Sequence, residues 1–85
     1  MSRKVVVDVV ASFRSGKIIP MKLTWPDGRA FRIDRVLDAH IGPSKSGGFG
    51  MRYTCRILGA EVLLYYDEVE QIWWCDGKEE QAGGF

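Results

Sequence analysis

The sequence is poor in the residues that build metal centres and disulfide frameworks. It contains two cysteines, Cys55 and Cys75, which are far apart in the chain, and one histidine, His40. Small secreted domains usually carry roughly four to eight cysteines, and structural zinc needs four ligands, usually in close pairs. The sequence therefore predicts no metal and no disulfide framework, and we expect both cysteines to be small buried hydrophobic residues of a reduced, cytoplasmic protein.

Long apolar runs are also missing. The stretch from Val5 to Val10 is interrupted by Asp8, and no segment approaches the roughly 18 apolar residues of a membrane span. The N-terminus has no convincing small-residue cleavage site. We therefore expect no membrane partner.

The residues that are present suit one small domain with a single core. The chain has 85 residues, of which 46% are hydrophobic and 27% charged, with a formal net charge of +1. This near-neutral total conceals a segregation, because residues 1–57 carry eleven Lys or Arg against four Asp or Glu, and residues 58–85 carry one against seven. Such asymmetry indicates either a basic binding face or two halves that attract one another.

Period-two alternation and a surplus of valine and isoleucine favour strands. The predicted strands cover residues 3–14, 18–25, 30–41, 51–58, 61–66 and 71–75. Pro20 indicates an edge position or a bulge, and Trp25-Pro-Asp-Gly28 predicts a turn. We expect an all-β domain over residues 1–76, a six-stranded antiparallel meander curled into a small SH3-like or partly open barrel, followed by a flexible tail over residues 77–85.

One alternative stays open within this fold. Apolar residues between Glu61 and Trp73 also fit helical spacing. We prefer the hairpin because the Tyr-Tyr and Trp-Trp pairs favour strands.

The doubled aromatic residues indicate a binding surface. Neighbouring residues on a strand point to opposite faces, so the hairpin places Tyr65, Ile72 and Trp74 on one side of the sheet. A single sheet in a chain this short has no second layer to cover them, so these three residues are a candidate partner-binding patch and a homodimer is the expected partner arrangement. The competing interpretation is that they only pack against lysine and arginine stems.

A second hypothesis assigns the chain to nucleic-acid binding. Residues 42–50 hold four glycines and predict a mobile loop, and the strand that follows is similar to an RNP1 pattern. The candidate residues are Arg32, Lys45, Phe49, Arg52 and Arg56. The same arginines could instead form cross-strand ion pairs with Asp38, beside His40.

Nothing in the sequence assembles into a catalytic set. Asp34 and Asp38 are expected to be solvated partners of arginines, not a pair of acid and base groups, and His40 is expected at the surface. No phosphate-binding loop is present, because the Gly-Lys-Ser/Thr sequence is missing. We therefore expect no enzyme activity, no cofactor and no small-molecule substrate.

Two motifs carry a resemblance. The runs W-x-D-G-R-x-F-x-I-D-x-V-L-D from Trp25 and G-x-R-Y-T-C-R-I ending at Ile57 resemble a family of short bacterial proteins to which no activity is assigned. A looser similarity, in the strand around Tyr53 and the paired tryptophans, is to small barrel domains encoded beside error-prone DNA polymerases. That similarity implies a connection with nucleic acid.

Overall fold

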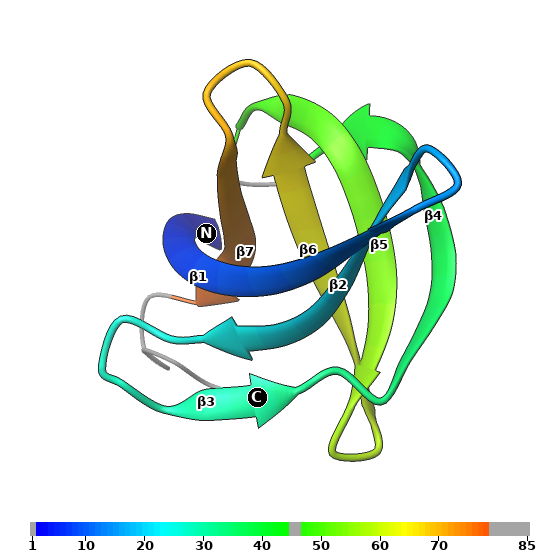
Figure 1. Ribbon diagram of the computed structural model, residues 1–85. Coiled ribbons are helices and arrows are strands. Elements are labelled where there is room, and N and C mark those ends of the chain that lie inside the picture. The colour runs from blue at the N-terminus through cyan, green and yellow to red at the C-terminus, as the bar shows by residue number, and fades with distance from the viewer. Residues whose placement is uncertain (1, 45–46, 79–85) are drawn as a thin grey trace.

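The computed structural model describes residues 2–44 and 47–78, which form seven strands and no helix. The strands are β1 (Ser2–Arg14), β2 (Lys17–Thr24), β3 (Ala30–Arg32), β4 (Arg35–Pro43), β5 (Phe49–Ile57), β6 (Ala60–Asp67) and β7 (Ile72–Lys78). They build one antiparallel sheet in the order β3-β2-β1-β7-β6-β5-β4, which curls into a half-barrel (Figure 1). The prediction of an all-β, partly open barrel is confirmed, with seven strands and not six.

The curl follows from the length of β1. Its alternating pattern continues over 13 residues, so its first half pairs with β7 and its second half with β2. The sheet is therefore two meanders joined through β1 and β7. Between Val10 and Ala11 the register with β2 shifts beside Pro20, which confirms the predicted bulge, since proline has no amide hydrogen for a ladder.

The single strand predicted over residues 30–41 is wrong. These residues form two strands, β3 and β4, which lie at opposite edges of the sheet. Between them Ile33 donates its amide hydrogen to the carbonyl of Met21, and Asp34 donates to the carbonyl of Arg56, both at 2.9 Å. Because Ile33 is buried, the alternation continues up to the crossing and is interrupted only at Arg35, an interruption that fits a bend within one strand as well as a break between two.

Side chains facing the interior of the half-barrel form the core. Leu23, Cys55, Ile57 and Leu64 are completely buried, and they come from three different strands. Cys75 on β7 joins them at 2% exposure, and both cysteines are free thiols. The expectation that the cysteines are small buried hydrophobic residues is confirmed.

The hairpin of β6 and β7 is confirmed over the alternative helix. Its cross-strand pairs are Leu64–Cys75, Tyr65–Trp74, Tyr66–Trp73 and Asp67–Ile72. Trp73 faces the core, with its ring centroid 4.5 Å from that of Tyr66, and its neighbour Trp74 faces outward beside Tyr65. β7 continues to Lys78, so the predicted tail begins too early at residue 77, and the remainder of that tail lies outside the described residues.

The turn predicted at Trp25-Pro-Asp-Gly28 is also confirmed. Gly28 donates its amide hydrogen to the carbonyl of Trp25 at 2.9 Å and has a φ of +93°. That conformation is open to glycine at little steric cost. The turn reverses the chain so that β3 can pair with β2.

Two glycines that face each other across β4 and β5 give a test of this packing. A Cβ atom at Gly50 would collide with the backbone carbonyl oxygen of Tyr66, whereas one at Gly42 would meet only the His40 ring at 3.8 Å. We expect Gly50→Ala to lower the free energy of unfolding by ~1–3 kcal/mol, as overpacking does, and Gly42→Ala to change it by less than ~0.5 kcal/mol. Urea unfolding followed by tryptophan fluorescence measures both, and equal effects would contradict the packing.

Candidate functional site

The aromatic pair on the outer face of the β6–β7 hairpin is covered by the chain itself. Tyr65 and Trp74 stack with their ring centroids 5.4 Å apart, and they are 1% and 0% exposed. The Trp74 indole donates from Nε1 to Ser44 Oγ at 3.2 Å, and a Cβ on Gly48 would touch its ring at 3.4 Å. Lys4 Nζ lies 4.3 Å from the centroid of the same ring.

The expectation of an exposed aromatic patch at Tyr65, Ile72 and Trp74 is therefore wrong. The three residues share the outer side as predicted, but only Ile72 retains some exposure. Ser44 and Gly48, which follow β4 and precede β5, lie against Trp74, and the Ser44 hydroxyl donates to the Gly47 carbonyl at 2.8 Å. The Ser44 hydroxyl, Gly48 and the Lys4 side chain together cover Trp74 in place of a second layer.

A polar chain crosses the outer face beside this cluster. Asp38 Oδ2 lies 2.7 Å from His40 Nδ1, and Arg52 Nη2 lies 2.9 Å from His40 Nε2. Because a guanidinium group can only donate, Nε2 accepts from Arg52, and the neutral ring donates from Nδ1 to Asp38. The lone pair that a general base would use is thus occupied. This arrangement positions Arg52 and provides no base.

The cysteines are not placed to act as nucleophiles. Burial raises the pKa of the Cys55 thiol to about 11. Burial, with the charges of Cys55 and Asp76, raises that of Cys75 to about 12. The thiolate is the reactive form, and it is scarce at neutral pH. Among the residues that the structure describes, no three His, Cys, Asp or Glu side chains are grouped to hold a metal ion.

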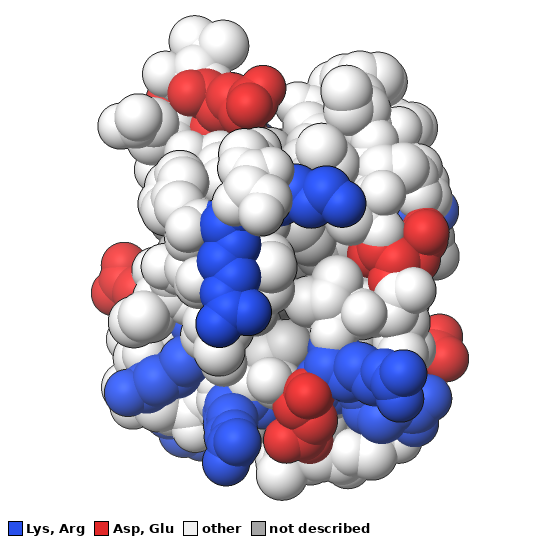
Figure 2. Space-filling view, turned by 45° about the vertical axis from the view of Figure 1, so that its right-hand side comes forward, with Lys and Arg blue, Asp and Glu red and all other residues white. Residues whose placement is uncertain are grey.

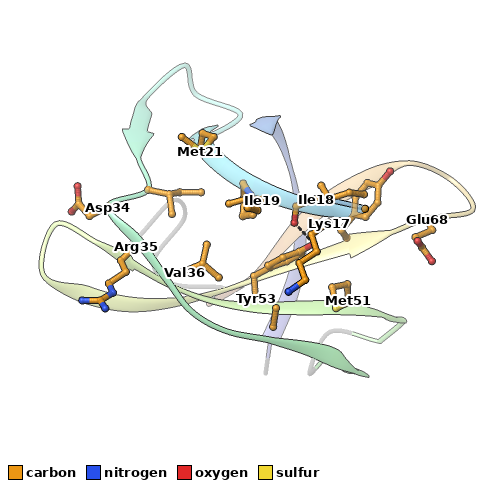
Figure 3. Close-up of a pocket in the computed structure, with 15 residues that line it drawn as sticks. Lys17, Ile18, Ile19, Met21, Asp34, Arg35, Val36, Met51, Tyr53 and Glu68 are labelled. Atoms are coloured by element: carbon orange, nitrogen blue, oxygen red, sulfur yellow. Dashed lines mark hydrogen bonds between the residues drawn. The ribbon is translucent and has the colours of Figure 1, made fainter. Parts of the chain in front are cut away.

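The half-barrel is open on one side, and we call the opening between residues 17–21 of β2 and strand β4 the seam. A pocket of about 630 Å³ lies in it. Its apolar lining includes Ile18, Ile19, Met21, Val36, Met51 and Tyr53. Tyr53 donates its hydroxyl hydrogen to the Ile18 carbonyl at 2.8 Å and so ties β5 to β2. Figure 3 shows Asp34 and Arg35 pointing away from the pocket.

Within residues 2–44 and 47–78, the strands that border the seam have backbone edges that pair with no further strand. β4 is the last strand on its side of the sheet, and β3 pairs only with residues 22–24 of β2. Large apolar side chains are exposed around these edges: Phe13 (76%), Met21 (49%), Leu37 (40%), Ile41 (64%) and Phe49 (63%). Apolar surface is therefore left at the seam, and also at Val6, which lies opposite Trp74 and is 51% exposed.

The residues of the predicted nucleic-acid site do not form one surface. Arg32 and Arg56 are exposed at the base of the half-barrel. Phe49 is exposed at the other end of β5, and Arg52 is held by His40. Lys45 lies outside the described residues.

Sequence reasoning also missed two basic residues. Lys22 lies directly opposite Arg32, and Arg35 directly opposite Arg56. The first pairing follows from the hairpin across the turn at residues 26–28, and the second from the register shift between Val36 and Asp38. Arg56 pairs with Glu61 of β6 at 3.8 Å, and not with Asp38 as expected.

Comparison with family models, curated proteins and solved structures gave no match for this chain. Both resemblances drawn from the sequence therefore stay predictions. In residues 2–44 and 47–78 there is no helix of the length and apolarity required to cross a membrane.

The raised thiol pKa values predict how stability depends on pH. Both lie above the ordinary value of 9.0, so the folded state keeps protons that the unfolded chain loses. The contribution of the protonated thiols to the free energy of unfolding is fully present below about pH 8. Between about pH 9 and 11 it falls by ~1.4 kcal/mol per pH unit for each thiol. Urea unfolding in reductant at about pH 7.5, 9.5 and 10.5 measures the fall.

Single alanine variants provide the control. Cys55→Ala should remove one thiol's share of the slope, because only Cys75 then titrates. Unchanged stability up to about pH 10.5 would contradict the buried, neutral thiols.

Proposed function

We propose that the chain is a non-enzymatic binding module that assembles with a second copy by pairing the free edges of their β4 strands. The observation that carries the proposal is the nine-residue edge strand β4, which pairs on one side with no other described strand and exposes most of its residues. Unpaired main-chain groups of an edge strand are a template for pairing with another chain.

The apolar character of this edge supports the proposal. Leu37 and Ile41 are 40% and 64% exposed, although Ile41 has the inward orientation of Met51, its cross-strand partner. Beside them the seam adds the half-exposed Met21 of β2. Clustered apolar surface of this kind marks interaction sites on soluble proteins.

The sequence of β4 is complementary to itself. If two copies pair antiparallel about a two-fold axis at Ala39, Leu37 of one lies opposite Ile41 of the other. In the same register Asp38 lies opposite His40 of the second copy. That His40 ring is in turn hydrogen-bonded to the Arg52 guanidinium of its own copy. The Asp38 side chain is 58% exposed and can accept a further hydrogen bond. The His40 side chain is 47% exposed, but both ring nitrogens already have partners, so it contributes van der Waals contact only. A two-fold interface repeats each favourable pair twice.

The chemistry of the described residues favours binding over catalysis. The two thiols are buried and protonated at neutral pH, and the imidazole nitrogen that could accept a proton is bonded to Arg52. A nucleophile paired with a free base is the minimum for most acyl transfer or hydrolysis. Strand pairing needs neither group.

Substitution of Ile41 tests the interface. Light scattering after size exclusion should show dimers at about 100 μM, and Ile41→Lys should raise the dissociation constant tenfold or more, which is about 1.4 kcal/mol. The reason is that lysine replaces an apolar contact at both symmetric positions. Val69→Lys is the matched control, because Val69 is 92% exposed on the β6–β7 turn.

Two results would overturn the proposal. One is a wild-type protein that remains monomeric up to about 100 μM. The other is dimerisation that Ile41→Lys leaves unchanged, or that Val69→Lys weakens equally.

A further inference from the structure

Two pairs of like charges face each other across strands at the base of the half-barrel. Lys22 of β2 lies directly opposite Arg32 of β3, and Arg35 of β4 lies directly opposite Arg56 of β5. All four side chains are exposed. Like charges directly opposite on a sheet destabilise it, so this arrangement leaves repulsion that an external anion would relieve.

The crossing segment between β3 and β4 joins the two pairs into one strip. Ile33 is hydrogen-bonded to Met21, which precedes Lys22, and Asp34 is hydrogen-bonded to the backbone of Arg56. The four residues therefore follow one another along the base, and we call them the basal strip. Figure 2 shows Lys and Arg side chains gathered over the lower part of that view, with Asp and Glu side chains between them.

Within the described part of the chain, the positive charge of the strip is only partly compensated. Arg56 has an ion pair with Glu61, at a long 3.8 Å. No ion pair joins a described residue to Lys22, Arg32 or Arg35, although the exposed Asp34 lies beside them.

We propose that the basal strip binds the phosphodiester backbone of nucleic acid. Arginine donors match phosphate oxygens in a two-pronged geometry, and lysine supplies a compact positive charge. The four positive charges of the strip lie in a row of two pairs and do not form a broad patch. A row of charges matches a linear chain of phosphates better than it matches a flat anionic membrane. The site contains Arg32 and Arg56 of the predicted nucleic-acid set and replaces Arg52 and Phe49 by Lys22 and Arg35. It does not depend on the pairing of β4 strands.

Salt dependence gives the number of charges involved. Neutralising about four phosphates predicts a slope of log affinity against log salt near −2.8 for a single strand and near −3.6 for a duplex. The affinity for a single strand should therefore fall about 50-fold between 50 and 200 mM salt.

Fluorescence anisotropy with a labelled oligonucleotide, offered both as a single strand and as a duplex, measures this slope. Lys22→Ala and Arg35→Ala should each weaken binding and reduce the slope for a single strand by about 0.7. Each removes one partner of a repulsive pair, so neither should lower the thermal midpoint. Arg14→Ala is the matched control, because Arg14 is exposed and lies opposite Lys17 at the far end of β2.

Several outcomes would overturn the proposal. They are no binding of either nucleic acid at about 20 mM salt, a slope that the strip variants leave unchanged, and equal weakening by Arg14→Ala. Binding to phosphatidylserine vesicles without binding to either oligonucleotide would assign the strip to a membrane surface instead.

Discussion

A single curled sheet has two faces, and this chain places a large indole on each of them. Trp73 and Trp74 are neighbours on β7, so strand geometry sends one inward and the other outward. Trp73 packs in the core, with its ring centroid 5.5 Å from that of Tyr53. Trp74 is fully buried under the connection between β4 and β5. The requirement to cover both indoles within one short chain determines much of the remaining structure.

The cover over Trp74 explains several features of β4 and β5. The two strands must extend far enough for their connection to reach the outer face, and Gly50 must have no side chain because Tyr66 and Trp74 approach it closely. Polar partners hold the same region, with Asp38, His40 and Arg52 bonded in series across the strands. With both indoles covered, exposed apolar side chains are found along the edge of β4 and the seam, and also on β1 and in the β5–β6 and β6–β7 turns. An edge and a face differ in the partner they accept, because an edge offers main-chain hydrogen bonds and so selects an extended strand.

Much of this fold could be predicted from the sequence where local patterns decide it. Alternation located most strands, Pro20 marked the bulge, and the aromatic pairs favoured the β6–β7 hairpin and gave its two sides. The break at Ile33 and Asp34 could not be predicted, because the interruption of the pattern at Arg35 fits a bend within one strand equally well. The burial of Trp74 could not be predicted either, since serine and glycine carry no signal that they will cover an indole. The basal strip depends on that break, because the crossing brings the Lys22–Arg32 pair of one hairpin next to the Arg35–Arg56 pair of another.

The claim that the free edge of β4 is the interaction surface can be tested through its backbone amides. Hydrogen exchange measured at increasing protein concentration reports which amides become protected on assembly, independently of any substitution. The account predicts that protection grows with concentration in residues 36–42 and stays constant in β6 and β7. Exchange in β4 that is fast at every concentration, or protection that grows over Tyr65 and Trp74 instead, would contradict it.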